Sequence, residues 1–251
     1  MIKLIQGDCL EKMKDIETGS VDMILTDPPY GTTACKWDSI IPLEPMWEQL
    51  KRIIKPNGAI VMTASQPFTT TLIASNMKMF KYCWVWDKVA VANPMLAKVM
   101  PLKTHEDITV FYAKKPTYNP QMTDGKVWSR GGVSGSLEFS GIEHKKTKRE
   151  SDRTNKRYPK TIQQFSTANR VNNTHPTQKP VALMEYLIKT YTNEGETVLD
   201  FTMGSGTTGV AAKKLNRSFI GIELDEGYFQ IARDRIEAVQ VVDDMVDIGV
   251  I

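Results

Sequence analysis

The pattern of apolar and polar positions divides the chain into three stretches. From Met1 to about Lys115, short apolar runs alternate with segments of helical spacing such as residues 45–54. The apolar runs have the length of β-strands and lie at residues 2–5, 21–26, 59–63, 82–86 and 108–112. Strands that alternate with helices are typical of crossover units, so this stretch predicts a mostly parallel sheet.

The same alternation returns from His175 onward. Residues 180–191 predict a helix that a proline opens in its first turn. Residues 197–201 and 218–224 predict two further strands. A Gly-rich turn and a helix to about Leu215 follow the first strand, and an amphipathic helix at 226–239 follows the second.

The stretch between them, residues 116–174, lacks this pattern and is basic. It holds 11 Lys and Arg against 5 Asp and Glu, whereas the whole chain has 32 against 29. The simplest architecture is one α/β domain, residues 1–115 and 175–240, with a basic insertion at 116–174 and a tail at 241–251. Two independent domains are the alternative, although the short C-terminal half could barely close a sheet of its own.

Composition narrows the class of protein. The chain has 251 residues, 41% hydrophobic and 24% charged, which excludes collagen, a wholly disordered chain and a disulfide-stapled miniprotein. Its three cysteines, Cys9, Cys35 and Cys83, follow no metal-ligand spacing, so we expect reduced thiols and no bound metal. Neither a signal peptide nor a membrane span is apparent, and the predicted location is cytoplasmic.

The Gly-rich turn after residue 199 has the composition of a cofactor loop. Its glycines are spaced G-x-G-x-x-G, at Gly204, Gly206 and Gly209. Glu223 follows about 20 residues later, where an acid can accept hydrogen bonds from ribose hydroxyls. The pattern fits a nicotinamide or flavin site, an S-adenosylmethionine site, or a purely structural turn. An amino-acid moiety is favoured over a pyrophosphate by the polar side chains of the turn, Asp200, Ser205, Thr207 and Thr208.

A second turn, Asp27-Pro28-Pro29-Tyr30, closes the strand predicted at residues 21–26. Its two prolines fix two φ angles and remove two N–H donors, so the turn is stiff and rich in unpaired carbonyls. Asp27 and the Pro28 carbonyl can accept hydrogen bonds from an exocyclic amine, and Tyr30 can stack on a planar base. A rigid turn with an N-capping aspartate is the structural alternative.

With these two turns, the sequence resembles the β-group amino-DNA methyltransferases. Residues 174–180 (Thr-His-Pro-Thr-Gln-Lys-Pro) and 7–10 (Gly-Asp-Cys-Leu) are also similar to segments of this group. The resemblance implies a Rossmann-like α/β fold with a mixed, mostly parallel sheet and helices on both faces. It also implies that the strands before Asp27 and Asp200 are neighbours, and that the target base is flipped out of the duplex. The family's loop usually has a proline after the aspartate, where this chain has Phe201.

The resemblance assigns roles to both halves of the domain, with residues 1–115 catalytic and residues 175–240 binding the cofactor. The implied catalytic residues are Asp27, Pro28, Pro29 and Tyr30. The implied residues for S-adenosyl-L-methionine are Asp8, Cys9, Lys179, Asp200, Phe201, Gly204, Ser205, Gly206, Thr207, Thr208 and Glu223. Lys179 as a solvated lysine and Asp8 as a helix cap are the structural alternatives. A structural role is also favoured for three residues without a partner set, His105, Glu106 and His144.

The basic insertion lies where this family carries target recognition, so we expect DNA binding there, a merely solvated loop being the alternative. The expected DNA-binding residues are Lys145, Lys146, Lys148, Arg149, Arg153, Lys156 and Arg157. Double-stranded DNA is the expected partner. A homodimer and a cognate restriction enzyme are further candidates that the resemblance suggests.

The function expected from the sequence is methyl transfer from S-adenosylmethionine to the N6 amine of adenine in duplex DNA, by direct in-line attack of the flipped base. Cytosine N4 is the nearest alternative because the same pocket chemistry serves both amines. RNA methylation, a non-catalytic DNA-binding protein and a dinucleotide oxidoreductase are more distant alternatives.

Overall fold

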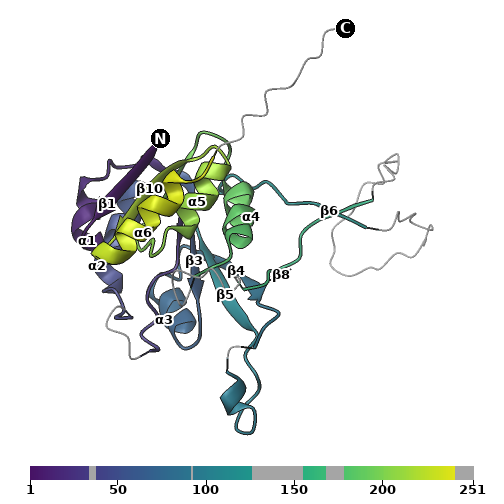
Figure 1. The fold of residues 1–251 in the computed structure, drawn as a ribbon. Helices are drawn as coiled ribbons and strands as arrows, with labels where there is room; N and C mark the ends of the chain where they lie inside the picture. Colours follow the sequence, from purple (N-terminus) through teal and green to yellow (C-terminus); the bar gives the residue numbers. More distant parts are fainter. Residues whose placement is uncertain (34–37, 92, 126–154, 168–177, 241–251) are drawn as a thin grey trace. The chain divides into compact units, whose positions relative to one another are not determined.

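A computed structural model describes residues 1–33, 38–91, 93–125, 155–167 and 178–240. The chain divides into two compact units. The larger combines Met1–Asn119 with Lys160–Ile251, and the smaller is Pro120–Pro159. Figure 1 traces both along the chain.

The larger unit is built on an eight-stranded sheet, and its strand order confirms the fold class predicted from the sequence. The strands, from one edge to the other, are β1 (Ile2–Gln6), β10 (Ser218–Glu223), β9 (Thr197–Asp200), β2 (Val21–Thr26), β3 (Ile54–Ala64), β5 (His105–Phe111), β4 (Phe80–Asp87) and β8 (Ile162–Gln164). All neighbouring pairs are parallel except those of β5, which runs antiparallel to both β3 and β4.

Helices cover both faces of this sheet (Figure 1). The described helices are α1 (Cys9–Lys12), η1 (Met13–Asp15), α2 (Leu43–Ile53), α3 (Phe68–Ser75), η2 (Pro94–Leu96), α4 (Val181–Tyr191), α5 (Thr207–Lys214) and α6 (Glu226–Glu237). The core is split accordingly. One apolar cluster contains residues of η1, α2 and α3, and the other contains residues of α4, α5 and α6.

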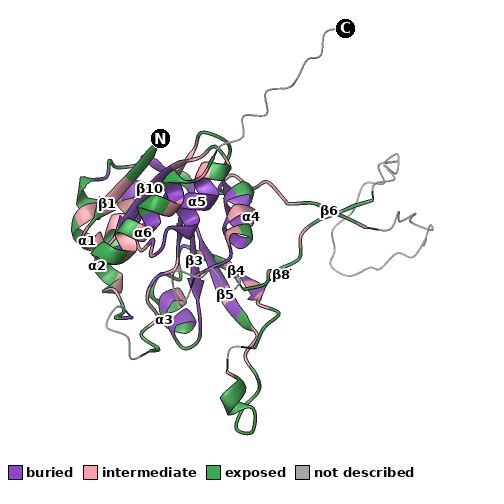
Figure 2. Cartoon of the chain, viewed as in Figure 1, coloured by how far each residue is buried: buried purple, intermediate pink, exposed green. Residues whose placement is uncertain are grey.

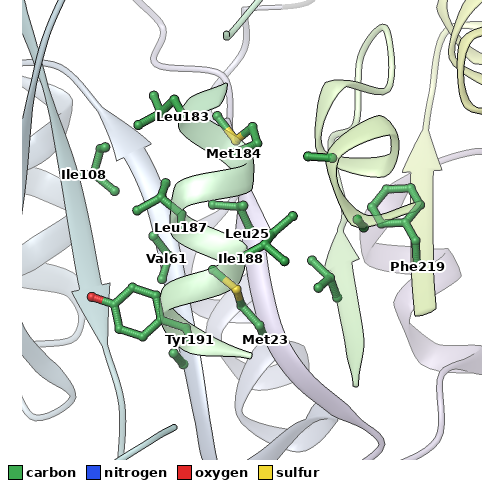
Figure 3. Close-up of a cluster of buried hydrophobic side chains, with 14 of the residues drawn as sticks. Met23, Leu25, Val61, Ile108, Leu183, Met184, Leu187, Ile188, Tyr191 and Phe219 are labelled. Carbon is green, nitrogen blue, oxygen red and sulfur yellow. The ribbon is translucent and has the colours of Figure 1, made fainter. Parts of the chain in front are cut away.

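The alternation of side chains along the central strands explains the two clusters. On β2, Met23 and Leu25 join the cluster of α4, whereas Ile24 between them joins the cluster of α2. Figure 3 shows α4 packed on this sheet, with Leu187 on the side of Val61 and Ile188 on the side of Leu25. Leu187 is 1% exposed, and its truncation to alanine is expected to cost about 2–5 kcal/mol of the free energy of unfolding.

The elements predicted from the sequence agree with the structure, and the differences lie in short or polar segments. The helix α3, the strand β8 and the short elements η1, η2, β6 and β7 were not predicted. β8 begins with an exposed Ile162 followed by two glutamines, so its sequence carries no apolar run. β8 pairs with β4, and Asn119 bonds to the end of α4, so both ends of the predicted insertion at 116–174 belong to the larger unit. The smaller unit, Pro120–Pro159, is therefore shorter than that insertion.

The smaller unit contains one described pair of antiparallel strands, β6 (Thr123–Asp124) and β7 (Lys156–Arg157). Figure 2 shows mostly exposed residues here, in contrast to the buried centre of the sheet. Within the residues that the structure describes, no helix has the length and apolarity needed to cross a membrane.

Candidate active site at the carboxyl ends of β9 and β2

Apart from Lys179, which precedes α4, the predicted catalytic and cofactor residues lie at or after the ends of four neighbouring parallel strands, β1, β10, β9 and β2. The carboxyl ends of parallel strands lie at the same edge of a sheet, so the segments after them come together. The Gly7 N–H donates to the Glu223 carbonyl at 2.8 Å, which joins the segments after β1 and β10. The Thr26 hydroxyl donates to Asp200 Oδ1 at 2.7 Å, which joins the segments after β2 and β9.

Residues 27–33, here named the Asp27 turn, follow β2. Both carboxylate oxygens of Asp27 accept hydrogen bonds from side chains. Oδ1 accepts from the Tyr30 hydroxyl at 2.7 Å and from the Thr63 hydroxyl, and Oδ2 accepts from Lys179 Nζ at 2.5 Å. Thr63 and Lys179 are buried, whereas the Asp27 side chain is 28% exposed. Asp27 is therefore oriented by the protein but stays accessible on one side.

Lys179 belongs to a chain of alternating charges. Its ammonium lies 3.6 Å from Glu106 Oε2, and the other oxygen of Glu106 pairs with Lys88. Burial alone would lower the pKa of Lys179, but the facing carboxylates of Asp27 and Glu106 outweigh it and raise the pKa above its ordinary value. Lys179 is therefore a charged donor to Asp27 at neutral pH.

Tyr30 completes the side-chain contacts of Asp27. Burial, followed by the nearby carboxylates of Asp27 and Glu106, raises its pKa well above the ordinary value, so the phenol remains a neutral donor. Its ring stacks on Phe68 with centroids 5.5 Å apart, and Lys179 Nζ lies 5.7 Å from the ring centroid.

The backbone of the Asp27 turn is held by Asp38. Its carboxylate accepts hydrogen bonds from the N–H groups of four consecutive residues, Tyr30, Gly31, Thr32 and Thr33. Burial opposes ionisation of Asp38, but these bonds outweigh it and lower its pKa. The turn is therefore fixed from both its backbone and its side chains.

Residues 200–206, here named the glycine turn, follow β9. Asp200 Oδ1 accepts from the Thr26 hydroxyl and from the Thr202 N–H at 3.1 Å, and burial raises its pKa to about 6. Gly206 has φ +80°, and a Cβ there would lie 2.9 Å from the Cβ of Ala232. Gly204 has φ +51° and no atom within 4 Å of such a Cβ, so the turn is open at that point.

Glu223, at the end of β10, ties the glycine turn to the next loop. Its carboxylate accepts from the Gly204 N–H at 2.8 Å and from the Asp225 N–H at 2.9 Å. Burial raises its pKa. Because a carboxylate offers about four acceptor positions, Glu223 retains capacity for the hydroxyls of a ligand.

Several predicted cofactor residues also have structural contacts. Asp8 caps α1 by accepting from the Leu10 N–H at 2.8 Å. Cys9 is partly buried, and its pKa is raised to about 12 by burial and by the neighbouring Asp8. Phe201 is 1% exposed and packs in the cluster of α2. Ser205 accepts from Arg235, and Thr207 and Thr208 are buried at the start of α5. A contact of any of these with the cofactor stays a prediction.

The sequence analysis missed the residues that surround Asp27 from other elements. Thr63 and Lys88 gave no signal because they lie in ordinary strand and loop positions. Asp38 follows the turn but belongs to no recognisable motif in the sequence. The structural role favoured for Glu106 omits its pairing with Lys179 beside Asp27. An acid two residues before the strand predicted at residues 108–112 is the feature that could have marked it.

Two of the predicted DNA-binding residues, Lys156 and Arg157, lie on β7 in the smaller unit. Lys156 pairs with Asp124 at 2.8 Å, with both side chains at least half exposed. The others lie outside the described residues, namely Lys145, Lys146, Lys148, Arg149 and Arg153.

Comparison with known families agrees with this site. The model of a DNA methylase family, the N6/N4 methyltransferases, matches residues 21–234. The chain belongs to this DNA methylase family. The match covers both turns and most of the sheet, and it confirms the resemblance found in the sequence.

Among curated relatives of this DNA methylase, the type II methyltransferase M2.DpnII of Streptococcus pneumoniae is 30% identical over 94% of the chain and 89% of the relative. The DNA adenine methyltransferase YhdJ of Escherichia coli is 28% identical over 93% of the chain and 82% of the relative. Both matches span nearly the whole methylase.

Two solved structures resemble the methylase fold. The M1.HpyAVI complex with S-adenosylmethionine (SAM) has a TM-score of 0.64 and 27% identity, and covers 94% of this chain and 100% of its own. The cytosine-N4-specific PvuII DNA methyltransferase has a TM-score of 0.68 over 98% of this chain and 88% of its own. At 16% identity it shows the fold alone. The cofactor predicted from the sequence, S-adenosylmethionine, is thereby confirmed for the family.

Proposed function

We propose that this DNA methylase transfers a methyl group from S-adenosylmethionine to the N6 amine of adenine in duplex DNA. The observation that carries the proposal is the Asp27 carboxylate, held by Tyr30, Thr63 and Lys179, on a residue whose carbonyl accepts from the Thr202 hydroxyl of the glycine turn at 3.2 Å. Adenine is preferred because Asp at the first position of the tetrapeptide is commonest among adenine-N6 enzymes of the family, and because YhdJ is named an adenine methyltransferase.

The residues around the glycine turn fit the proposed cofactor. Glu223 has acceptor capacity for ribose hydroxyls, and Gly204 leaves the turn open toward a ligand. The Gly7 N–H bonds to the Glu223 carbonyl, which joins the segment of Asp8 and Cys9 to the end of β10, and we propose that these two residues contact the same ligand. When bound, S-adenosylmethionine supplies an electrophilic methyl group on a sulfonium.

The role of Asp27 follows from its hydrogen-bond capacity. Tyr30, Thr63 and Lys179 occupy three of the roughly four acceptor positions of its carboxylate, so one remains for an incoming amine. The Pro28 carbonyl, which belongs to a stiff turn, can accept the second amine hydrogen. These two bonds favour a tetrahedral nitrogen and free its lone pair, which is otherwise delocalised into the ring, for in-line attack.

Cytosine N4 is the second candidate because its amine presents the same two hydrogens, and the PvuII fold relative is named cytosine-N4-specific. The test is incubation with S-adenosylmethionine and methylation-free duplex DNA, then nucleoside digestion and mass spectrometry. N6-methyladenine is the expected product. N4-methylcytosine would retain the site chemistry and overturn the choice of base, and methyl transfer to RNA alone would overturn the choice of substrate.

The proposed function includes DNA contacts by the basic insertion, whose expected residues include Lys156 and Arg157. Phosphate contacts of this kind make affinity fall steeply with salt. Relatives named type II methyltransferases make a cognate restriction enzyme a further proposed partner, and we also propose a homodimer.

A further inference from the structure

The segment between β4 and β5 exposes an unusual number of large apolar side chains. Residues 93–104, here named the apolar loop, contain the short helix η2 and extend away from the end of the β4–β5 pair (Figure 1). Figure 2 shows this segment as almost entirely exposed. The exposed fractions are 96% for Met95, 42% for Leu96, 78% for Val99, 49% for Met100 and 43% for Leu102. Apolar side chains gathered in this way mark an interaction surface.

The stem of the apolar loop is fixed to the active site. Lys103 donates to the Ser65 hydroxyl at the end of β3, and its N–H donates to Asn93 Oδ1 at 2.6 Å. Lys88, on the other side of the stem, pairs with Glu106. Glu106 also faces Lys179, and Lys179 donates to Asp27. The apolar loop therefore begins at the same edge of the sheet as the candidate active site.

The charge of this segment indicates the kind of partner. The apolar loop has two lysines, Lys98 and Lys103, and no Asp or Glu, while Lys88 beside it is paired with Glu106. A second copy of the loop would bring the same positive charges together, which disfavours pairing of two such loops. The lysines and the exposed apolar side chains together fit a partner that has negative charge on its surface and flat apolar faces in its interior. A DNA duplex has both, in its phosphates and its stacked bases.

We propose that the apolar loop is a wedge that enters the base stack beside the target and keeps the target base out of the duplex. The inference rests on the proposed function, in which the base must leave the stack to reach Asp27. Apolar side chains inserted between base steps are a known means of unstacking a duplex. Met95 and Val99, the most exposed members, are the residues assigned to insertion.

The experiment compares two duplexes that contain the sequence methylated by the unaltered protein. In one the target base is paired, and in the other it lies opposite an abasic site, so that no pairing opposes its exit. The variant carries Met95→Ser, Val99→Ser and Met100→Ser. The matched control is Met77→Ser, 63% exposed and placed before β4 at the opposite edge of the sheet.

For the triple variant we expect kcat/KM to fall tenfold or more on the paired duplex and to stay within about twofold of the unaltered protein on the abasic duplex. Met77→Ser is expected to match the unaltered protein on both. An equal loss on both duplexes, or no loss on either, would overturn the wedge. So would loss of a dimer in sedimentation that accounts for the defect, since the loop would then join two copies.

Failure of the proposed function is seen separately, in the unaltered protein. If that protein methylates cytosine, the choice of adenine fails while the same pair of duplexes, built around cytosine, still decides the wedge. If the unaltered protein binds S-adenosylmethionine but methylates no duplex DNA from which such a sequence could be taken, the proposed function fails and the wedge is overturned with it.

Discussion

The Asp27 turn and the glycine turn lie side by side at one edge of the sheet but are held by different kinds of contact. Asp27 depends on side chains far along the chain, because Thr63 is 36 residues away and Lys179 is 152 residues away. The glycine turn depends mainly on its own backbone and on the neighbouring strand. Its Thr202 N–H reaches Asp200 two residues back, and the Gly206 N–H donates to the Met203 carbonyl at 2.8 Å.

The Asp27 turn therefore depends on polar and charged side chains, whereas the glycine turn depends on backbone conformation. The Asp27 turn gathers two hydroxyls and one ammonium from separate parts of the chain around one carboxylate, so its chemistry requires the finished fold. The conformation of the glycine turn depends on a few positions whose φ angles only glycine adopts without strain. Substitutions in the first are therefore expected to reduce turnover, and substitutions in the second to reduce stability and cofactor affinity.

The largest expected effect is that of Asp27→Asn. The variant keeps the shape of the side chain but replaces a charged acceptor with an amide, so the target amine loses a charged partner. We expect kcat to fall about 10²–10³-fold, the range found when one oriented polar group is removed from an active site. Single-turnover methylation measures the rate of methyl transfer, and a calorimetric titration with S-adenosylmethionine measures cofactor affinity. An unchanged rate of methyl transfer would contradict the role of Asp27.

Gly206→Ala and Gly204→Ala test the glycine turn as a matched pair. Both positions have positive φ, but a Cβ on Gly206 meets Ala232 whereas one on Gly204 meets no atom within 4 Å. We expect Gly206→Ala to lower the free energy of unfolding by about 2–4 kcal/mol and Gly204→Ala by about 1–2 kcal/mol. Urea unfolding measures both, and equal losses would show that the contact with Ala232 relaxes.

Asp200 connects the two turns and makes stability depend on pH. Burial raises its pKa from 3.8 to about 6, so between these values the folded chain keeps a proton that the unfolded chain has lost. This contribution to the free energy of unfolding is present at low pH and is lost as pH rises through about 6. Asp200→Asn retains an acceptor oxygen and removes the ionisation.

Relative to the unaltered protein, Asp200→Asn should therefore gain up to about 3 kcal/mol in the free energy of unfolding between pH 4 and pH 7. Urea unfolding at several pH values gives this difference. A constant difference across the range would mean that Asp200 keeps its ordinary pKa.

The smallest expected effect is that of Glu106→Gln, which tests the distant support of Asp27. The amide weakens the attraction on Lys179 and leaves its contact with Asp27 less fixed. We expect kcat to fall about tenfold while the dissociation constant of S-adenosylmethionine stays within twofold. Glu11→Gln, in an exposed pair with Lys14, is the control and should leave both quantities unchanged. Weaker cofactor binding with normal kcat would place Glu106 in a different role.

How far the sequence predicts this site depends on the range of the contacts. β2 and the turn after it were predicted at their observed positions, because an apolar run and two prolines are local signals. The neighbouring arrangement of β2 and β9 required the family resemblance. The contacts of Asp27 with Thr63 and Lys179 could not be predicted because these residues come from separate parts of the chain and meet only through the strand order, although the resemblance implied Lys179 as a cofactor residue.

The pairing of β2 with β9 has a consequence for synthesis of the chain on the ribosome. Met23 lies opposite Val198, so β2 has no partner on this side until the ribosome has made the residues of β9, in the last quarter of the polypeptide. Until then β2 is an edge with open N–H and C=O groups, and the apolar side chains of α5 and α6 that complete the cluster of Met23 and Leu25 are still missing. Nascent or truncated chains that stop before Thr197 are therefore expected to aggregate or to need a chaperone.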